Sequence, residues 1–295
     1  MRKIAFIGFG EAATAISGGW DRDAAGAITA YDIKTDSPAP AIASAKRGDY
    51  RTAGIEGCDD LKSALDGAAL VFSTVTADQA LVAARNAAEC LPAGALYFDM
   101  NSCSPGAKRQ AAERIEAVGG RYVDVAVMAP VYPGRHRVPL LVSGPHAGDG
   151  IAALESLSMN PALTEGPVGT SSTIKMIRSI MVKGIEAVVV ECVLSAVHEG
   201  IDETVLASLA KTFPGFDWPD RAAYMLERVM VHGRRRAEEM REVAKTVDEL
   251  GLEGRMARAS AGWQDAVGSL ELNQLSEEEK ADYRLLARKV LDRLG

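Results

Sequence analysis

The sequence predicts an α/β protein: a doubly wound sheet in its N-terminal part, then an all-α part entered by one long helix. Two observations predict this fold class. Short apolar runs alternate with helical stretches up to about residue 165, which is typical of βαβ units. After Gly166-Pro167 no clear strand pattern follows. We therefore expect two domains, residues 1–166 and residues 167–295.

The expected elements follow from apolar runs, helical periodicity and Gly or Pro punctuation. The expected strands are Lys3–Ile7, Ile28–Tyr31, Leu70–Thr74, Ala95–Phe98, Tyr122–Val127 and Leu140–Ser143. The expected helices of the first domain are Glu11–Trp20, Leu61–Leu65, Asp78–Cys90 and Lys108–Ala117, and Ser37–Pro40 is expected to be a loop. The expected helices of the second domain are Thr170–Val197, Glu203–Thr212, Arg221–Leu250, Gly254–Val267 and Ser276–Leu294.

Composition excludes several function classes. Lys plus Arg total 33 against 40 for Asp plus Glu, giving a net charge of −7, which argues against broad binding to nucleic acids or anionic membranes. The four cysteines form no CxxC pair and the four histidines show no ligand spacing, so we expect neither a disulfide framework nor a metal site. No apolar run is long enough for a membrane span, and a strand is expected at once from Lys3. We expect a cytoplasmic protein.

A glycine-rich turn separates the first strand from the first helix. Its sequence is Gly8-Phe9-Gly10-Glu11-Ala12-Ala13, a G-x-G-x-x-A pattern. The first glycine permits a tight turn, the second lets the backbone approach a pyrophosphate, and the small third residue lets helix pack on strand. The helix N-terminus offers unpaired N–H groups to the phosphates. The turn therefore predicts a dinucleotide site and a Rossmann-type domain.

An acidic residue ends the second expected strand. Asp32 lies 24 residues after Gly8, where a carboxylate accepts hydrogen bonds from the adenosine ribose and repels a 2′-phosphate. This favours NAD over NADP. Lys34, two residues further on, softens that repulsion, so NADP stays open as a cofactor.

Small polar residues close two neighbouring strands at the edge where such a domain carries its cofactor. Thr74 and Val75 follow one strand, and Asn101 and Ser102 follow the next. We expect all four to contact the cofactor or, for Asn101 and Ser102, the substrate. Plain loop and capping chemistry is the alternative, because Ser104-Pro105 is a favourable helix start.

The long helix carries a polar stripe. At about 100° per residue, Arg178, Ser179, Val182 and Glu186 lie on the side of Lys175, and Lys183 lies close to it. The opposite side carries apolar residues such as Ile177, Met181 and Ile185. A buried lysine is costly unless it is compensated. The stripe is therefore either a solvated face or a site with Lys175 as a catalytic group.

Four segments in order resemble the β-hydroxyacid dehydrogenase family, which includes 3-hydroxyisobutyrate and 6-phosphogluconate dehydrogenases. They are the turn Gly8–Ala13, the segment Asp99–Pro105 (similar to D-x-S-T-x-S-P), the stretch Tyr122–Val127 (where the family has its D-A-P-V-S-G-G loop), and Gly169–Lys175 (similar to G-x-x-x-K-x-x-x-N). The resemblance implies that Lys175 is the catalytic general acid/base and Ser102 a substrate contact.

Three departures from the family pattern predict different substrate handling. Met128-Ala129-Pro130 replaces S-G-G, Ser179 replaces the asparagine after the lysine, and Glu238–Met240 replaces K-D-L. These stretches resemble the subgroup with a DUF1932 C-terminal domain, whose members are mostly labelled 6-phosphogluconate dehydrogenase-like. The chain is much shorter than a true 6-phosphogluconate dehydrogenase, which argues against that substrate.

The resemblance implies an NAD(P)-dependent oxidoreductase that oxidises a secondary alcohol of a small hydroxy acid or sugar acid. Lys175 would take the hydroxyl proton, which requires a pKa far below the usual value of about 10.4. The expected substrate contacts are Asn101, Ser102, Arg178, Ser179, His232 and Arg236, with Arg235, His136 and Arg137 as further candidate cations. A homodimer formed by the helical domain is also implied. The alternatives are an imine or ketone reductase, decarboxylation after oxidation, and a non-catalytic dinucleotide sensor.

Overall fold

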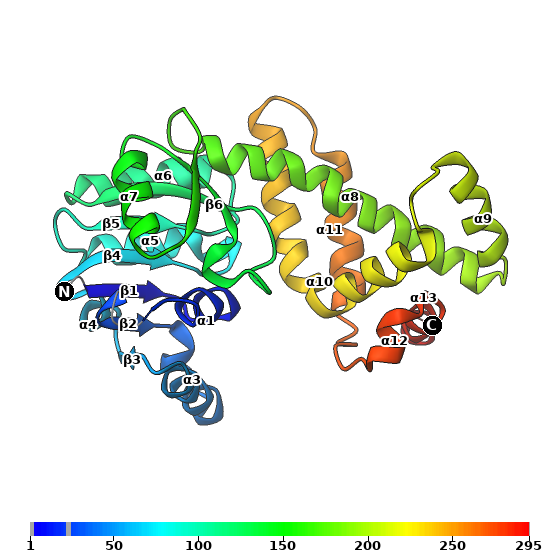
Figure 1. The fold of residues 1–295 in the computed structure, drawn as a ribbon, viewed down its shortest axis with the longest axis horizontal. Helices are drawn as coiled ribbons and strands as arrows, with labels where there is room; N and C mark the ends of the chain where they lie inside the picture. The colour runs from blue at the N-terminus through cyan, green and yellow to red at the C-terminus, as the bar shows by residue number, and fades with distance from the viewer. Residues whose placement is uncertain (1–2, 22–24, 295) are drawn as a thin grey trace. The chain divides into compact units, whose positions relative to one another are not determined.

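The computed structural model describes residues 3–21 and 25–294 and divides into two compact units, one ending at Met176 and the other beginning at Ile177. The first unit is built on an eight-stranded sheet in the order β3-β2-β1-β4-β5-β6-β7-β8 (Figure 1). The strands are β1 (Lys3–Ile7), β2 (Ile28–Tyr31), β3 (Glu56–Gly57), β4 (Ala68–Ser73), β5 (Leu96–Asp99), β6 (Arg121–Val127), β7 (Pro139–Ser143) and β8 (Asn160–Leu163). This is the predicted Rossmann-like architecture.

Helices of the first unit cover both faces of this sheet. They are α1 (Glu11–Ser17), α3 (Pro40–Ala53), α4 (Leu61–Leu65), α5 (Ala80–Ala88), α6 (Pro105–Ala117) and α7 (Ala147–Ser156), with short 3-10 turns η1 (Ile33–Asp36), η2 (Ala77–Gln79) and η3 (Arg135–Arg137). Successive strand residues point to opposite faces. Ile4 and Phe6 accordingly pack in the cluster that includes α1 and α7, whereas Ala5 and Ile7 pack in the cluster with α4, α5 and α6.

Several features of the first unit differ from the sequence expectation. Strands β3 and β8 and helices α3 and α7 were not among the expected elements. Strand β7 runs antiparallel to β6, because the connection of residues 128–138 contains only the turn η3 and no crossover helix. Helix α3 occupies a stretch whose start was expected to be loop. Pro40 is its first residue, a position where the missing N–H costs nothing, and Gly54 ends it in the left-handed conformation.

The second unit is helical, as predicted. The long helix α8 (Thr170–His198) begins in the first unit and supplies most of its length to the second. It is followed by α9 (Asp202–Thr212), α10 (Trp218–Glu249), α11 (Arg255–Gly268), α12 (Glu277–Ala281) and α13 (Tyr283–Leu294). Helices α10 and α11 approach closely at Gly233, where the absence of a side chain leaves room for the neighbouring backbone. A Cβ on Gly233 would lie 2.3 Å from the carbonyl oxygen of Gln264. In residues 3–21 and 25–294, every helix is too short or too polar to span a bilayer.

Candidate active site

The glycine-rich turn has the geometry that a dinucleotide requires. Gly8 adopts φ +79°, and a Cβ there would lie 2.8 Å from Val75 Cγ1 and 2.9 Å from the carbonyl oxygen of Thr74. Only glycine fits both the conformation and the close approach to the end of β4. Gly10 is exposed, and a Cβ on it would meet nothing within 4 Å. The backbone at the start of α1 is therefore open to a bound phosphate, so the residues present fit the cofactor.

Two side chains clamp the middle of this turn. Asp32 Oδ2 accepts a hydrogen bond from the Phe9 backbone N–H at 2.8 Å, and Asp32 Oδ1 accepts one from Lys34 N–H at 2.9 Å. Lys46 Nζ, on α3, donates to the Phe9 carbonyl oxygen at 2.7 Å and pairs with Asp49. Each carboxylate oxygen has a second lone pair, so Asp32 can hold the turn and still accept from a ribose hydroxyl. Sequence reasoning missed Lys46.

Hydrogen bonds connect the turn to the ends of β4 and β5. Thr74 Oγ1 donates to the Gly8 carbonyl oxygen at 2.8 Å, and Val75 N–H donates to Asn101 Oδ1 at 2.7 Å. Asn101 Nδ2 donates to Ser73 Oγ and to Asp99 Oδ1, and the Asn101 side chain is buried. Asn101 therefore joins the two strand ends, which fixes the backbone next to Ser102.

Lys175 lies against Ser102 at this edge of the sheet. Its Nζ is 2.6 Å from Ser102 Oγ, and both residues are half-buried. Gly8, Thr74, Val75, Asn101, Ser102 and Lys175 thus form one continuous set of contacts within the first unit. An amine beside a hydroxyl can exchange a proton with a substrate alcohol that lies within hydrogen-bond reach of both.

Beneath this contact lies a charge network that the sequence did not reveal. Lys108 on α6 is fully buried; its Nζ lies 3.0 Å from Asp99 Oδ1 and 3.5 Å from Asp124 Oδ1. Burial by itself lowers the pKa of Lys108, but the carboxylates around it, Asp99 first, outweigh burial and raise that pKa overall. Tyr122 OH donates to Asp99 Oδ2 at 2.7 Å, and burial followed by the Asp99 charge raises its pKa.

The sequence did carry a signal for Lys108. It stands at the head of the row Lys108, Ala111, Ala112 and Ile115. These are positions i, i+3, i+4 and i+7, which lie on one face of a helix, the buried face of α6. A lysine on an apolar stripe predicts a buried cation with partners.

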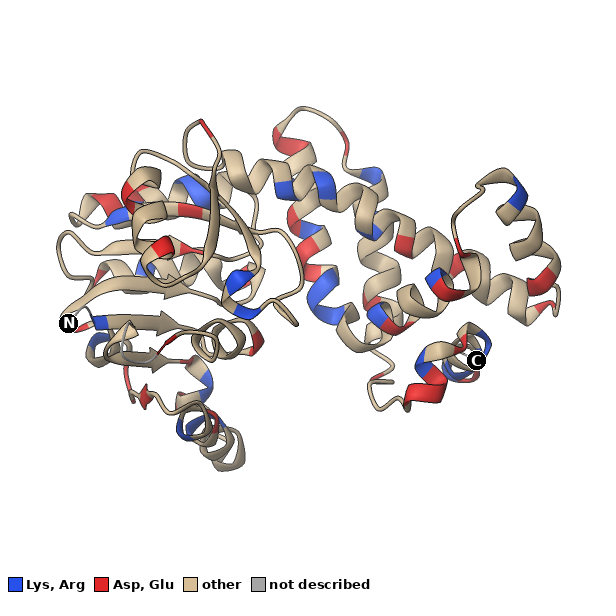
Figure 2. Cartoon of the chain, in the orientation of Figure 1, with Lys and Arg blue, Asp and Glu red and all other residues tan. Residues whose placement is uncertain are grey.

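Of the remaining predicted site residues, His136 and Arg137 lie in the turn η3 of the first unit, and the others belong to the second unit. On α8, Arg178 is exposed and Ser179 is buried, and Lys183 Nζ lies 2.8 Å from Glu239 of α10. Burial lowers the pKa of Lys183, with Glu239 acting against it. Arg236 of α10 is buried and paired with Glu186 of α8, to which Gln264 also donates. Charged residues of both signs alternate along α10 (Figure 2).

The polar stripe of α8 is therefore turned inward over this part of the helix. Ser179, Lys183 and Glu186 are buried, whereas the apolar side is exposed. We expected this stripe to be either a solvated face or a catalytic one. Over this part of α8 it is instead a buried face, whose charges are compensated by ion pairs with α10.

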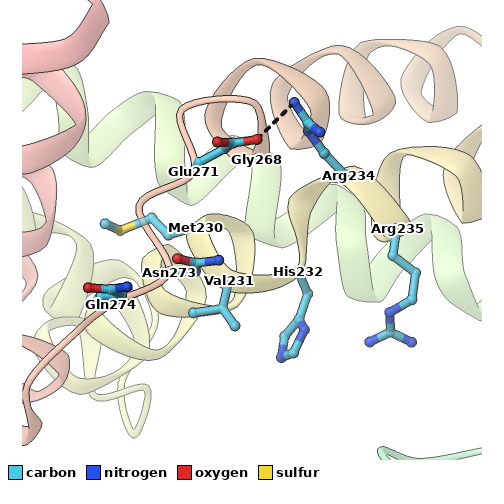
Figure 3. Close-up of a pocket in the computed structure, with 9 residues that line it drawn as sticks. All are labelled: Met230, Val231, His232, Arg234, Arg235, Gly268, Glu271, Asn273 and Gln274. Carbon is cyan, nitrogen blue, oxygen red and sulfur yellow. Dashed lines mark ion pairs between the residues drawn. The ribbon is translucent and has the colours of Figure 1, made fainter. Parts of the chain in front are cut away.

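His232 and Arg235 line a pocket of about 730 Å³ between α10 and the segment after α11 (Figure 3). Both side chains project to the same side of α10, whereas Arg234 points to Glu271, with which it pairs at 3.4 Å. Asn273 and Gln274 add amide groups to the lining. Arg236 is not among the lining residues. The pocket is polar and carries more basic than acidic groups.

Comparison with known proteins identifies both units. Residues 3–146 match the model of the NAD binding domain of 6-phosphogluconate dehydrogenase, and residues 196–267 match the domain of unknown function DUF1932. A conserved hypothetical protein from Sinorhizobium meliloti 1021 is 39% identical; the match covers 99% of this chain and 97% of that one, with a TM-score of 0.73.

Two further structures share the fold. MTH1747, a conserved protein of unknown function described as structurally similar to 3-hydroxyacid dehydrogenases, is 28% identical over 91% of this chain and 98% of its own, with a TM-score of 0.65. Mycobacterium tuberculosis 3-hydroxyisobutyrate dehydrogenase is 15% identical over 98% of each chain, with a TM-score of 0.69. The chain therefore belongs to the family in which a 6-phosphogluconate dehydrogenase-type NAD-binding domain precedes a DUF1932 domain, on the scaffold of the 3-hydroxyacid dehydrogenases.

Proposed function

We propose that the protein is an NAD(P)-dependent oxidoreductase that oxidises the secondary alcohol of a small hydroxy acid or sugar acid, with NAD as the preferred cofactor. The observation that carries this proposal is the 2.6 Å contact between Lys175 Nζ and Ser102 Oγ, connected by hydrogen bonds to the glycine-rich turn. A lysine held beside a hydroxyl at the cofactor edge of such a domain is the arrangement that alcohol oxidation requires.

In the proposed reaction the bound dinucleotide supplies the hydride acceptor. Lys175, as the neutral amine, takes the hydroxyl proton of the substrate, and Ser102 orients the oxygen that loses it. In the reverse direction the Lys175 ammonium returns the proton. Gly8–Ala13, Asp32, Thr74 and Val75 hold the cofactor, and Asn101 keeps the backbone of Val75 and Ser102 in place.

The anionic group of the substrate is assigned to basic side chains of the helical unit. Arg178 is exposed and His232 lines the polar pocket, so both are accessible to a ligand. Arg236 is buried and paired with Glu186, and Ser179 is buried near Lys183, so we assign the anionic group to neither of them.

We also propose that the protein is a homodimer. Ile177, Met181, Ile185 and Val188 form an apolar row on α8, at spacings of four, four and three residues, and Met181 and Val188 are 64% and 57% exposed. An apolar row of this length on a helix is typical of a protein–protein interface. A second copy of the chain would cover it.

The test is a screen of NAD and NADP reduction against hydroxy acids, aldonates and their phosphates, followed by nicotinamide absorbance. We expect reduction with at least one of them and a higher kcat/KM with NAD. A higher kcat/KM with NADP would overturn the cofactor assignment. Tight NADH binding with no reduction across the panel would favour the sensor function and overturn the proposal.

A further inference from the structure

We infer that Asp99, Lys108 and Asp124 form a positioning network that sets Lys175 against Ser102. This inference rests on the proposed function for its catalytic meaning, and on the contacts of the first unit for its geometry. The network has two arms, one leading to each partner of the hydrogen bond between Lys175 and Ser102.

The first arm fixes the start of α8. Asp124 Oδ2 accepts hydrogen bonds from the backbone N–H groups of Gly169 at 3.0 Å and Ser172 at 3.3 Å, and Asp124 Oδ1 accepts from Ser172 Oγ at 2.7 Å. The first N–H groups of a helix have no partner within the helix and carry its positive dipole end. A carboxylate from β6 therefore caps α8, and Lys175 lies three residues after Ser172, on the next turn.

Gly169 allows this cap to form. Its φ is +100°, and a Cβ on it would lie 3.1 Å from Pro105 Cβ, at the start of α6. The chain before α8 therefore passes close to the helix that carries Lys108.

The second arm fixes Ser102. Asp99 Oδ1 accepts from the backbone N–H of Asn101 at 3.0 Å and from Asn101 Nδ2 at 2.7 Å. Lys108 joins the two arms, because its ammonium pairs with the carboxylates of both Asp99 and Asp124. It also donates to the Asp99 carbonyl oxygen at 2.6 Å. Asp99, Lys108 and Asp124 are 0% exposed, so water does not weaken their interactions.

Adjacent serines offer a matched pair of variants. Ser172 Oγ donates to Asp124, whereas Ser171 Oγ is equally buried and has no hydrogen-bond partner within the part of the chain that the structure describes. Ser172→Ala and Ser171→Ala thus remove the same atom from neighbouring buried positions, and only the first removes a hydrogen bond to Asp124. Ser172→Thr keeps the hydroxyl.

We expect Ser172→Ala to lower kcat about tenfold with the KM for NAD unchanged, since misplacing a reacting group by a fraction of an ångström slows the chemical step. Ser172→Thr should recover most of the loss, and Ser171→Ala should keep the wild-type kcat. Equal losses in Ser171→Ala and Ser172→Ala, or an unchanged kcat in Ser172→Ala, would overturn the inference.

A second readout is independent of turnover. Reductive methylation of the intact protein, followed by peptide mass spectrometry, measures how fast Lys175 reacts, with the exposed Lys62 as internal reference. We expect Lys175 to react several-fold faster in Ser172→Ala than in Ser171→Ala, because its amine is no longer held at Ser102. Equal rates would overturn the inference. The expected rate difference in a protein that reduces no cofactor would leave the positioning network supported and the proposed function refuted.

Discussion

Replacing Lys108 by methionine tests the buried charge network directly. Methionine is close to lysine in length but removes the ammonium group, which leaves Asp99 and Asp124 buried without that counter-ion and hydrogen-bond donor. Breaking a buried ion pair by deleting one partner costs about 3–5 kcal/mol. That loss is a large fraction of a stability of roughly 5–15 kcal/mol. For a unit of this size it lowers the unfolding temperature by about 10 °C.

Scanning calorimetry at neutral pH measures this loss as a lower unfolding temperature. Lys62→Met, on an exposed position of α4, is the control and should change stability by less than about 0.5 kcal/mol. The raised pKa of folded Lys108 means that its contribution is complete below the unfolded pKa of about 10.4 and is lost only at higher pH. A Lys108→Met variant within about 1 kcal/mol of the wild type would refute the buried network.

Two further predictions concern titration and assembly. Burial first, and then Arg137 and Arg135, lower the pKa of His136 in the folded state. The unfolded chain therefore takes up the proton first as the pH falls below about 6.5, and the free energy of unfolding declines over that window. Urea unfolding should show a less steep decline in His136→Gln than in the wild type, and identical slopes would contradict the prediction. Met181→Glu places a charge in the exposed apolar row of α8 and should lower the mass measured by light scattering from that of a dimer to that of a monomer. The control Glu191→Gln should keep the dimer mass. A wild-type protein with the mass of a monomer would contradict the proposed dimer.

Periodicity predicted six of the eight strands that the structure describes and the long helix, because strand and helix patterns are local properties of the sequence. Strand β7 was predicted but its antiparallel direction was not, since strand direction depends on whether the preceding connection forms a crossover helix. Helix α3 as a whole was missed; Pro40 at its start, read as a loop signal, also suits the first position of a helix.

The site was predictable where a residue follows a strand end, as with Thr74 and Asn101, and where a family motif marked it, as with Lys175. The charge partners were not predictable, because they depend on contacts between residues far apart in the chain. Asp124 meets Ser172 across 48 positions, and Arg236 meets Glu186 across 50. In each case a charge on an apolar helix face or within an apolar strand was the only local signal.

The central claim is that the Lys175 amine carries the substrate proton, and chemical rescue of Lys175→Ala tests it most directly. Removing a general base costs about 10²–10⁴ in rate. We predict that the variant binds NADH as the wild type does, loses turnover by about that factor, and regains activity in proportion to added small primary amines. Near-normal turnover without added amine, or lost turnover that no amine restores while NADH still binds, would contradict the claim.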